Sequence, residues 1–167
     1  MPIKIKPLSR KTLKPAIKLL HGVFAYPEGR RETKKGLTIS LDPEKYKETY
    51  KKEKLKWVKY YVALEGAKVV GTSGLYKMEN DPKETFWLGW FCVDETYRRK
   101  GIGSKLLDYT IREEKRRSGR TLKLWTTNHP PMLTAQILYR KMGFKIFKKE
   151  RISGTGYQTI YERLKLK

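Results

Sequence analysis

The segment "TFWLGWFCVDETYRRKGIGSKLLDYTI", residues 85–111, places an apolar run, a loop rich in cations and glycines, and an amphipathic pattern in direct succession. The apolar residues of 85–93 do not alternate with polar ones, so we expect a strand that is buried on both faces and lies centrally in a sheet. After the loop, Ile102, Leu106 and Ile111 recur with helical spacing. The segment therefore predicts a strand, a loop and a helix.

The loop itself has the composition of an anion site. The start of a helix has about four free backbone N–H groups and a partial positive charge. Gly101 and Gly103 let an anion approach that backbone closely, and cations such as Arg98 add charge-assisted bonds. The loop matches neither the dinucleotide-binding glycine pattern nor the P-loop. A tight turn with incidental cations is the alternative interpretation.

The rest of the chain reads as alternating short helices and strands without an internal repeat. Hydrophobic periodicity and turn residues predict the order β-α-α-β-β-β-α-β-α-β-β, which is a mixed α/β fold. Residues 26–41 carry glycines and many charges and are predicted to be a mobile loop, and Asp42 is predicted to cap the second helix. The predicted strands lie at residues 3–5, 57–64, 68–76, 85–93, 121–127, 145–150 and 157–164, and the helices at 13–24, 42–56, 103–117 and 134–142.

Length and composition limit the class of protein. The 167 residues suffice for one domain, and no apolar run approaches the roughly 20 residues of a membrane span. One cysteine and two distant histidines predict neither a disulfide nor a metal site, and we expect a cytoplasmic protein. The net charge of +22 has two interpretations, a nucleic-acid partner or lysine-rich helix faces with a small anionic ligand.

Two motifs resemble those of one superfamily. The stretch "VDETYRRKGIGSKLL", residues 93–107, resembles the acetyl-coenzyme A loop of the GCN5-related N-acetyltransferase (GNAT) superfamily, whose pattern is Arg/Gln-x-x-Gly-x-Gly/Ala. The stretch "AQILYRKMGF", residues 135–144, resembles its second motif. The resemblance implies an acyl-CoA N-acyltransferase fold over residues 1–167, as one domain. Such a fold has a mixed, largely antiparallel central sheet of six to seven strands with about four helices.

The resemblance also implies a cofactor and a reaction. Acetyl-CoA would donate its acetyl group to a primary amine by direct attack in a ternary complex, and coenzyme A would be the co-product, without a metal. Tyr139 would protonate the leaving thiolate, although a tyrosine that only packs in the core is the alternative. The residues implied to bind the cofactor are Phe91, Cys92, Val93, Arg98, Arg99, Lys100, Gly101, Ile102, Gly103, Ser104 and, from the end of its strand, Asn128.

Some positions depart from the family pattern. Met132 stands where the family often has an asparagine, and the central strand lacks the glutamate that is the base in many members. Glu65, His129 or a chain of waters are the candidate bases. Cys92 is expected to be a small buried residue rather than a nucleophile. Gly89 is either a bulge residue or a small residue beneath packed tryptophans.

The partners of the chain are less defined by its sequence. The backbone N–H near Val93 is expected to polarise the thioester carbonyl. The acceptor amine is expected to contact residues 24–50 and the last two strands. A polycation is disfavoured by the overall charge, whereas a neutral or acidic small amine, a protein N-terminus and a protein lysine stay open. A non-catalytic GNAT-like basic module that binds nucleic acid is the alternative, and a homodimer also stays open.

Overall fold

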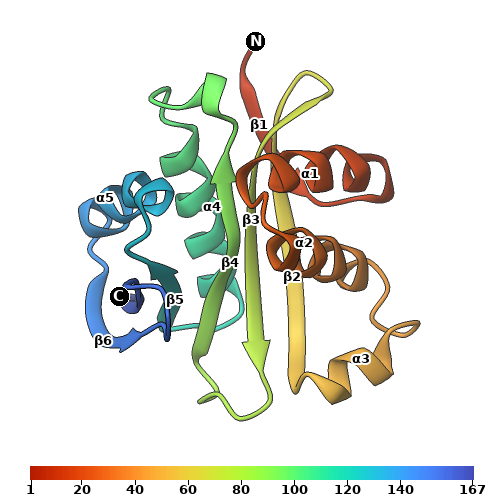
Figure 1. Ribbon diagram of the computed structural model, residues 1–167. Helices are drawn as coiled ribbons and strands as arrows, with labels where there is room; N and C mark the ends of the chain where they lie inside the picture. Colours follow the sequence, from red (N-terminus) through yellow and green to blue (C-terminus); the bar gives the residue numbers. More distant parts are fainter.

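The computed structural model describes residues 1–167, and its centre is one mixed seven-stranded sheet (Figure 1). The strand order is β1-β2-β3-β4-β5-β7-β6, and every neighbouring pair is antiparallel except β4 and β5. The predicted mixed, largely antiparallel sheet is therefore confirmed. The strands are β1 (Ile3–Pro7), β2 (Leu55–Glu65), β3 (Lys68–Met78), β4 (Thr85–Val93), β5 (Thr121–Thr127), β6 (Lys145–Arg151) and β7 (Gln158–Lys165).

The helices cover both faces of this sheet (Figure 1). Tyr60 and Tyr61 are neighbours in β2 and belong to opposite faces. Tyr60 packs in a cluster with Leu20 and Leu37 from the first two helices, whereas Tyr61 packs with Leu107 and Tyr139 from the last two. The α-helices are α1 (Arg10–Val23), α2 (Pro27–Ser40), α3 (Lys47–Lys52), α4 (Ile102–Arg116) and α5 (Leu133–Lys141).

The prediction of a mobile loop at residues 26–41 is wrong, because this segment contains α2. Pro27 stands at the first turn of the helix, where its missing N–H costs no hydrogen bond. The face turned to the sheet carries Gly29, Thr33 and Leu37, all buried. An added Cβ at Gly29 would meet the Tyr26 ring at 2.8 Å, so the residue must be small. The buried face is thus helical in spacing but only partly hydrophobic.

The helix predicted at residues 42–56 is also largely wrong. The Asp42 carboxylate does accept the backbone N–H of Lys45 at 3.2 Å, but the chain only turns there, and α3 covers just Lys47–Lys52. None of the α3 residues is buried, so no packing surface extends the helix. Strand β2 then begins at Leu55. The remaining predicted elements are confirmed, with ends that shift by a few residues.

The sheet divides between β4 and β5. These two parallel strands pair only from Thr85 to Trp87 and from Thr121 to Lys123. Beyond that register no pairing joins them, although β4 stays paired with β3 and β5 stays paired with β7. The backbone of the second half of β4 is therefore open on one side, next to the loop that follows it.

Two glutamates lie inside the core, Glu114 of α4 and Glu162 of β7. Both are completely buried, and neither carboxylate has a hydrogen-bond partner. Burial raises the pKa of Glu114 to about 8, against the opposing charges of Lys115 and Lys77. Burial also raises the pKa of Glu162, against the charge of Arg140. Both groups therefore favour the protonated, neutral form in the folded chain.

We expect the free energy of unfolding to fall as the pH rises from about 5 to about 8. In this window the folded state keeps a proton on Glu114 that the unfolded chain releases near 4.5, so each pH unit costs up to roughly 1.4 kcal/mol. Urea unfolding of the wild type and of Glu114→Gln at about pH 6 and about pH 8 measures this difference. The variant should gain about 2 kcal/mol relative to the wild type at the higher pH. Parallel pH profiles would contradict the assignment.

Candidate functional site

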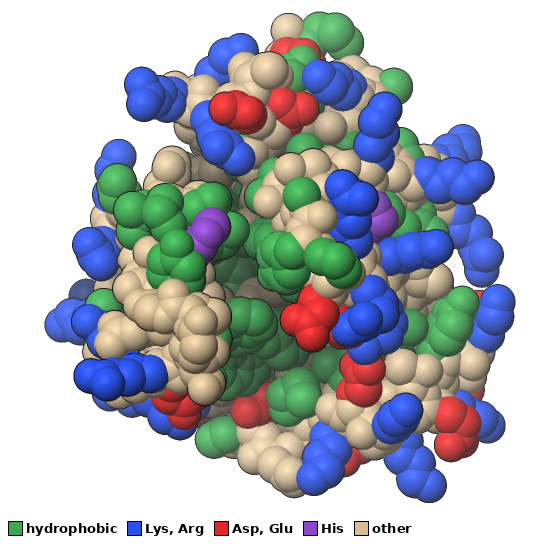
Figure 2. Space-filling view, viewed as in Figure 1, with side chains coloured by type: hydrophobic (Ala, Val, Ile, Leu, Met, Phe, Trp, Pro, Cys, Tyr) green, Lys and Arg blue, Asp and Glu red, His purple; other side chains and the backbone are tan.

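A cavity of about 710 Å³ occupies the place where β4 and β5 separate. Its wall has 27 residues, of which 18 are hydrophobic, and they come from both layers of helices and from the sheet. Figure 2 shows the hollow from its open side, with hydrophobic side chains on its floor. An apolar hollow with few polar groups is the usual form of a site for a small organic ligand.

A bulge in β4 shapes one wall of the cavity. Thr72 faces Cys92 and Gly74 faces Gly89, so two residues of β4, Trp90 and Phe91, oppose one residue of β3. Trp90 has a φ of +33°, which is rare for a bulky residue, and its carbonyl accepts the Thr72 hydroxyl at 2.8 Å. The bulge predicted at Gly89 lies one residue further on.

The bulge changes which way the side chains of β4 point. Gly89 lies in one row with Gly74 and Tyr60 across three strands. A Cβ at Gly74 would approach the Tyr60 ring to 2.4 Å, so the glycine leaves room for that ring. Trp90 lies on the same face and packs edge-on against Phe24 of α1, with ring centroids 4.9 Å apart. Phe91 points to the opposite face, against Tyr139.

The end of β4 offers free backbone groups to the cavity side. The N–H of Asp94 donates to Val70 of β3. Because backbone groups alternate along a strand, those of Val93 and Phe91 point away from β3, toward the unpaired side. The Val93 carbonyl accepts Arg98 Nε at 3.1 Å. Arg98 thereby fixes the strand end to the loop.

The loop between β4 and α4 presents a row of free donors. Arg99 and Gly101 have φ values of +62° and +75°, and Gly101 is the N-cap of α4. The N–H groups of Gly101 and of the three residues after it donate to no acceptor within the chain. They are the open amides of a 15-residue helix, and Arg98, Arg99 and Lys100 directly precede them in the loop. This arrangement suits a phosphate group.

Gly103 marks the point where the loop meets the rest of the site. A Cβ at this position would lie 3.2 Å from Leu138 of α5, 3.5 Å from Phe91 and 3.7 Å from Val93. The start of α4, the end of β4 and helix α5 therefore converge here. The predicted cofactor loop thus lies beside Phe91 and Val93 of the predicted cofactor strand, while Cys92 and Ile102 are buried.

Tyr139 of α5 lines the cavity close to that convergence. Its ring lies 5.9 Å from the Phe91 ring and 5.7 Å from the Phe144 ring. The residue is only 6% exposed, and burial raises the pKa of its phenol well above the ordinary value, with further contributions from Glu162 and Cys92. The hydroxyl is therefore protonated at neutral pH and is available as a hydrogen-bond donor.

Asn128 lies at the end of β5 but does not line the cavity. Its side-chain oxygen accepts the N–H of Gln158 at 2.7 Å and joins β5 to β7. Only its side-chain NH₂ group is left to donate, so contact with a cofactor stays a prediction. Nearby, Gln136 is buried and donates to the Thr127 carbonyl at 2.6 Å. That bond holds α5 against the end of β5.

The other candidates from the sequence fall in different places. The Cys92 thiol is buried beside Thr72, and burial raises its pKa to about 11, so it is a poor nucleophile. Glu65 lies outside the cavity wall and accepts the Tyr97 hydroxyl at 2.6 Å. His129 does line the cavity, edge-on to Tyr157 with ring centroids 4.8 Å apart.

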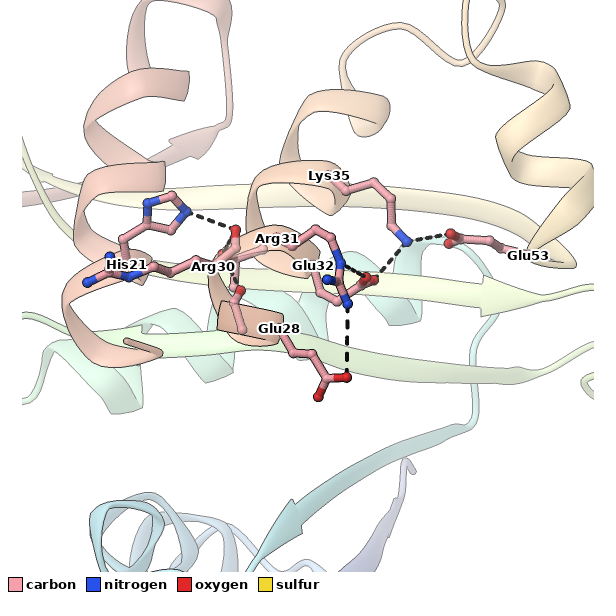
Figure 3. Close-up of polar contacts among 9 residues, drawn as sticks. His21, Glu28, Arg30, Arg31, Glu32, Lys35 and Glu53 are labelled. Atoms are coloured by element: carbon pink, nitrogen blue, oxygen red, sulfur yellow. Dashed lines mark hydrogen bonds and ion pairs between the residues drawn. The ribbon is translucent and has the colours of Figure 1, made fainter. Parts of the chain in front are cut away.

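Sequence analysis missed three charged residues of the cavity wall, Glu32, Lys35 and Glu53. Figure 3 shows Lys35 reaching toward both carboxylates, and its distance to Glu32 is 2.8 Å. The hydrogen bond from Lys35 lowers the pKa of Glu32, which keeps that carboxylate ionised. The helical spacing of Glu32 and Lys35 is the signal that could have identified two of these residues. The glycines and charges of residues 26–41 instead predict a loop there.

The chain has no group of three or more His, Cys, Asp and Glu side chains arranged to hold a metal ion. None of its helices combines the length and the apolar character that crossing a membrane requires.

Comparisons with known proteins agree with this geometry. A family model described as an acetyltransferase (GNAT) domain matches residues 56–146. The match runs from β2 into β6 and includes the bulge, the loop after β4 and Tyr139. A comparison with curated proteins found no significant match.

Solved structures share the fold over almost the whole chain. A protein described as a GNAT-family acetyltransferase from Desulfovibrio desulfuricans has a TM-score of 0.79 and 16% identity, with 98% of this chain and 99% of that chain covered. The ribosomal-protein-S18-alanine N-acetyltransferase from Escherichia coli has a TM-score of 0.72 and 18% identity, with 99% and 94% covered. An aminoglycoside 6'-N-acetyltransferase complexed with coenzyme A has a TM-score of 0.72 and 17% identity, with 97% and 96% covered.

Proposed function

The chain belongs to the acetyltransferase (GNAT) domain family, and we propose that it transfers the acetyl group of acetyl-CoA to a primary amine. One observation carries the proposal. The four free N–H groups that open α4 lie next to the end of β4, where a Cβ at Gly103 would be 3.5 Å from Phe91, and β4 is unpaired there and lines an apolar cavity through Phe91. Here an anion site lies next to a cavity that can hold an acyl group. This arrangement fits a cofactor that has a pyrophosphate at one end and a thioester at the other.

We assign each part of acetyl-CoA to a part of the site. The pyrophosphate lies on the amides of residues 99–104, with Arg98 and Lys100 adding positive charge. The pantetheine arm runs along the backbone of Phe91 and the N–H of Val93, as an added strand would, since Arg98 already occupies the Val93 carbonyl. Coenzyme A is bound in the aminoglycoside acetyltransferase that shares this fold, which supports the placement. We also propose that residues 1–167 act as one domain.

The reaction needs no covalent enzyme intermediate. The nitrogen of a neutral primary amine forms a bond to the thioester carbonyl carbon, and the carbon–sulfur bond then breaks. The backbone N–H of Val93 stabilises the developing oxyanion. Tyr139 donates a proton to the departing sulfur and regains one that the amine nitrogen releases. The products are an amide and free coenzyme A, and holding both substrates in one cavity supplies much of the rate.

Glu32, Glu53 and His129 are the side chains of the cavity wall that can accept a proton from an incoming ammonium. An ammonium group cannot attack a carbonyl, so one proton must leave before the transfer. We propose that this proton leaves through the open side of the cavity, where these residues lie.

Calorimetric titration with acetyl-CoA tests the proposal directly. We expect binding of one molecule per chain at micromolar concentration, and release of free thiol when a panel of primary amines is added. Tight binding of RNA together with no binding of acetyl-CoA would overturn it in favour of a basic nucleic-acid module. Titrations at two salt concentrations separate the cofactor site from a general polyanion effect, since the latter weakens steeply with salt.

A further inference from the structure

The part of the cavity that faces α2 is distinct from the part that faces β5 and α5. We call it the acceptor chamber. Its walls come from the segment between α1 and α2, from α2, from β2, from the end of β3 and from the bulge of β4 (Figure 2). The aromatic side chains that line it are Phe24, Tyr26, Tyr60, Tyr76 and Trp90.

Glycines let the aromatic side chains of this chamber pack close to the backbone. Gly36 of α2 lies opposite the bulge, where an added Cβ would come within 3.0 Å of the Tyr60 hydroxyl and 3.5 Å of Trp90 Nε1. At Gly89 a Cβ would approach the Tyr76 ring to 3.1 Å. The part of the cavity beside these aromatic rings, which we call the slot, suits a flat apolar body.

The charges of the chamber oppose those of the whole protein. Glu32, Lys35 and Glu53 are the only lysine, arginine, aspartate or glutamate side chains in the cavity wall, and they sum to one negative charge. The chain as a whole carries +22. Figure 3 shows the three side chains meeting between α2 and the end of α3, with Lys35 shared by both carboxylates. A cation that enters the chamber therefore meets a locally negative wall.

We propose that the acceptor is an arylalkylamine, a primary amine on a short chain attached to an aromatic body. This inference rests on the proposed acetyl transfer. The aromatic body lies between Tyr60, Tyr76 and Trp90, and the excess negative charge attracts the ammonium group before it loses its proton. The chamber thus admits an acceptor with one positive charge, although the net charge of the chain disfavours a polycation.

Other amines fit this wall less well. A polyamine, an amino sugar or a peptide N-terminus brings several further polar groups, and an apolar wall leaves them without hydrogen-bond partners. An amine that also carries a carboxylate would be repelled by the carboxylates of Glu32 and Glu53. An arylalkylamine carries one polar group, which is the one that reacts.

A panel of acceptors at saturating acetyl-CoA tests the substrate class. We expect kcat/KM for phenylethylamine and tryptamine to exceed that for spermidine, glucosamine and an alanine-initiated tetrapeptide by about tenfold or more. A higher kcat/KM for any of the last three would overturn the inference and leave the acetyl-transfer proposal standing. If acetyl-CoA does not bind in the parallel calorimetric titration, the proposed function itself fails.

A matched pair of double variants tests the role of charge. Glu32→Gln with Glu53→Gln changes the chamber by two charges, whereas Glu28→Gln with Glu48→Gln makes the same total change on α2 and α3 outside the cavity. We expect the first pair to raise KM for tryptamine roughly tenfold at low salt, with less effect at high salt, and the second to change it less than about twofold. Equal effects of both pairs would refute a local role of the carboxylates.

A second test addresses the shape of the slot. Gly36→Val narrows the chamber, while Gly22→Val makes the same change in α1, where no atom lies within 4 Å of the added Cβ. We expect Gly36→Val to lower kcat/KM for tryptamine by about tenfold and that for propylamine much less, with acetyl-CoA affinity kept. A uniform loss for both amines would show that the slot does not select the aromatic body.

Discussion

Replacing Gly101 by aspartate is expected to weaken acetyl-CoA binding by roughly 100-fold relative to replacement by asparagine. Gly101 has a φ of +75°, and no atom lies within 4 Å of an added Cβ, so both side chains fit the space. Asparagine and aspartate both tolerate this left-handed conformation. The two variants differ in one negative charge, which the aspartate places at the open N–H groups that begin α4.

The asparagine variant separates electrostatics from backbone strain. Both substitutions restrict the same backbone and add nearly the same volume, so a loss shared by the two would reflect conformation alone. Aspartate also favours the helix dipole, so its stability should not fall below that of the asparagine variant. Calorimetric titration with acetyl-CoA and thermal unfolding measure the two effects. Equal affinity of both variants would contradict a phosphate site at this loop.

The sequence predicted β4, the loop and α4 because each depends on local signals. An apolar run, a pair of glycines and a helical apolar spacing are all contained in residues 85–111. The same holds for Gly143, whose φ of +99° ends α5 where the sequence predicted an end. Elements whose secondary structure is determined by their own residues can be predicted without knowing what packs against them.

Helix α2 could not be predicted from local signals of this kind. Its buried face carries Gly29 and Thr33 beside Leu37, and the Thr33 hydroxyl donates to the Gly29 carbonyl at 2.7 Å. The face is small because Tyr26 packs on Gly29, a contact that appears only in the folded chain. Hydrophobic periodicity is weak where tertiary packing requires small residues, and the charges of the exposed face then dominate the pattern.

The separation of β4 from β5 likewise could not be predicted from the sequence. It depends on which strands pair over long sequence distances, and the pairing stops after Trp87 although the apolar run continues to Val93. The chamber carboxylates Glu32 and Glu53 meet only because α2 and the end of α3 both border that opening. The contact between residues of different elements, such as that of Lys35 with Glu53, leaves no mark in local spacing.

Replacing Tyr139 by phenylalanine is expected to lower kcat by roughly 100-fold, with acetyl-CoA affinity changed little. Phenylalanine keeps the ring that packs between Phe91 and Phe144, so the fold and the cofactor surface should be preserved. What is lost is a protonated hydroxyl that lines the cavity and can donate a hydrogen bond there. A departing thiolate would then have to take its proton from water.

Tyr61→Phe is the matched control, because Tyr61 belongs to the same hydrophobic cluster and does not line the cavity. We expect that variant to keep the wild-type kcat within about twofold. Steady-state kinetics at saturating amine, calorimetric titration with acetyl-CoA and urea unfolding of both variants separate catalysis from packing. An unchanged kcat in Tyr139→Phe would remove the phenol from the proton transfer. An equal loss in both variants would instead assign the effect to the core, because only Tyr139 of the two lines the cavity.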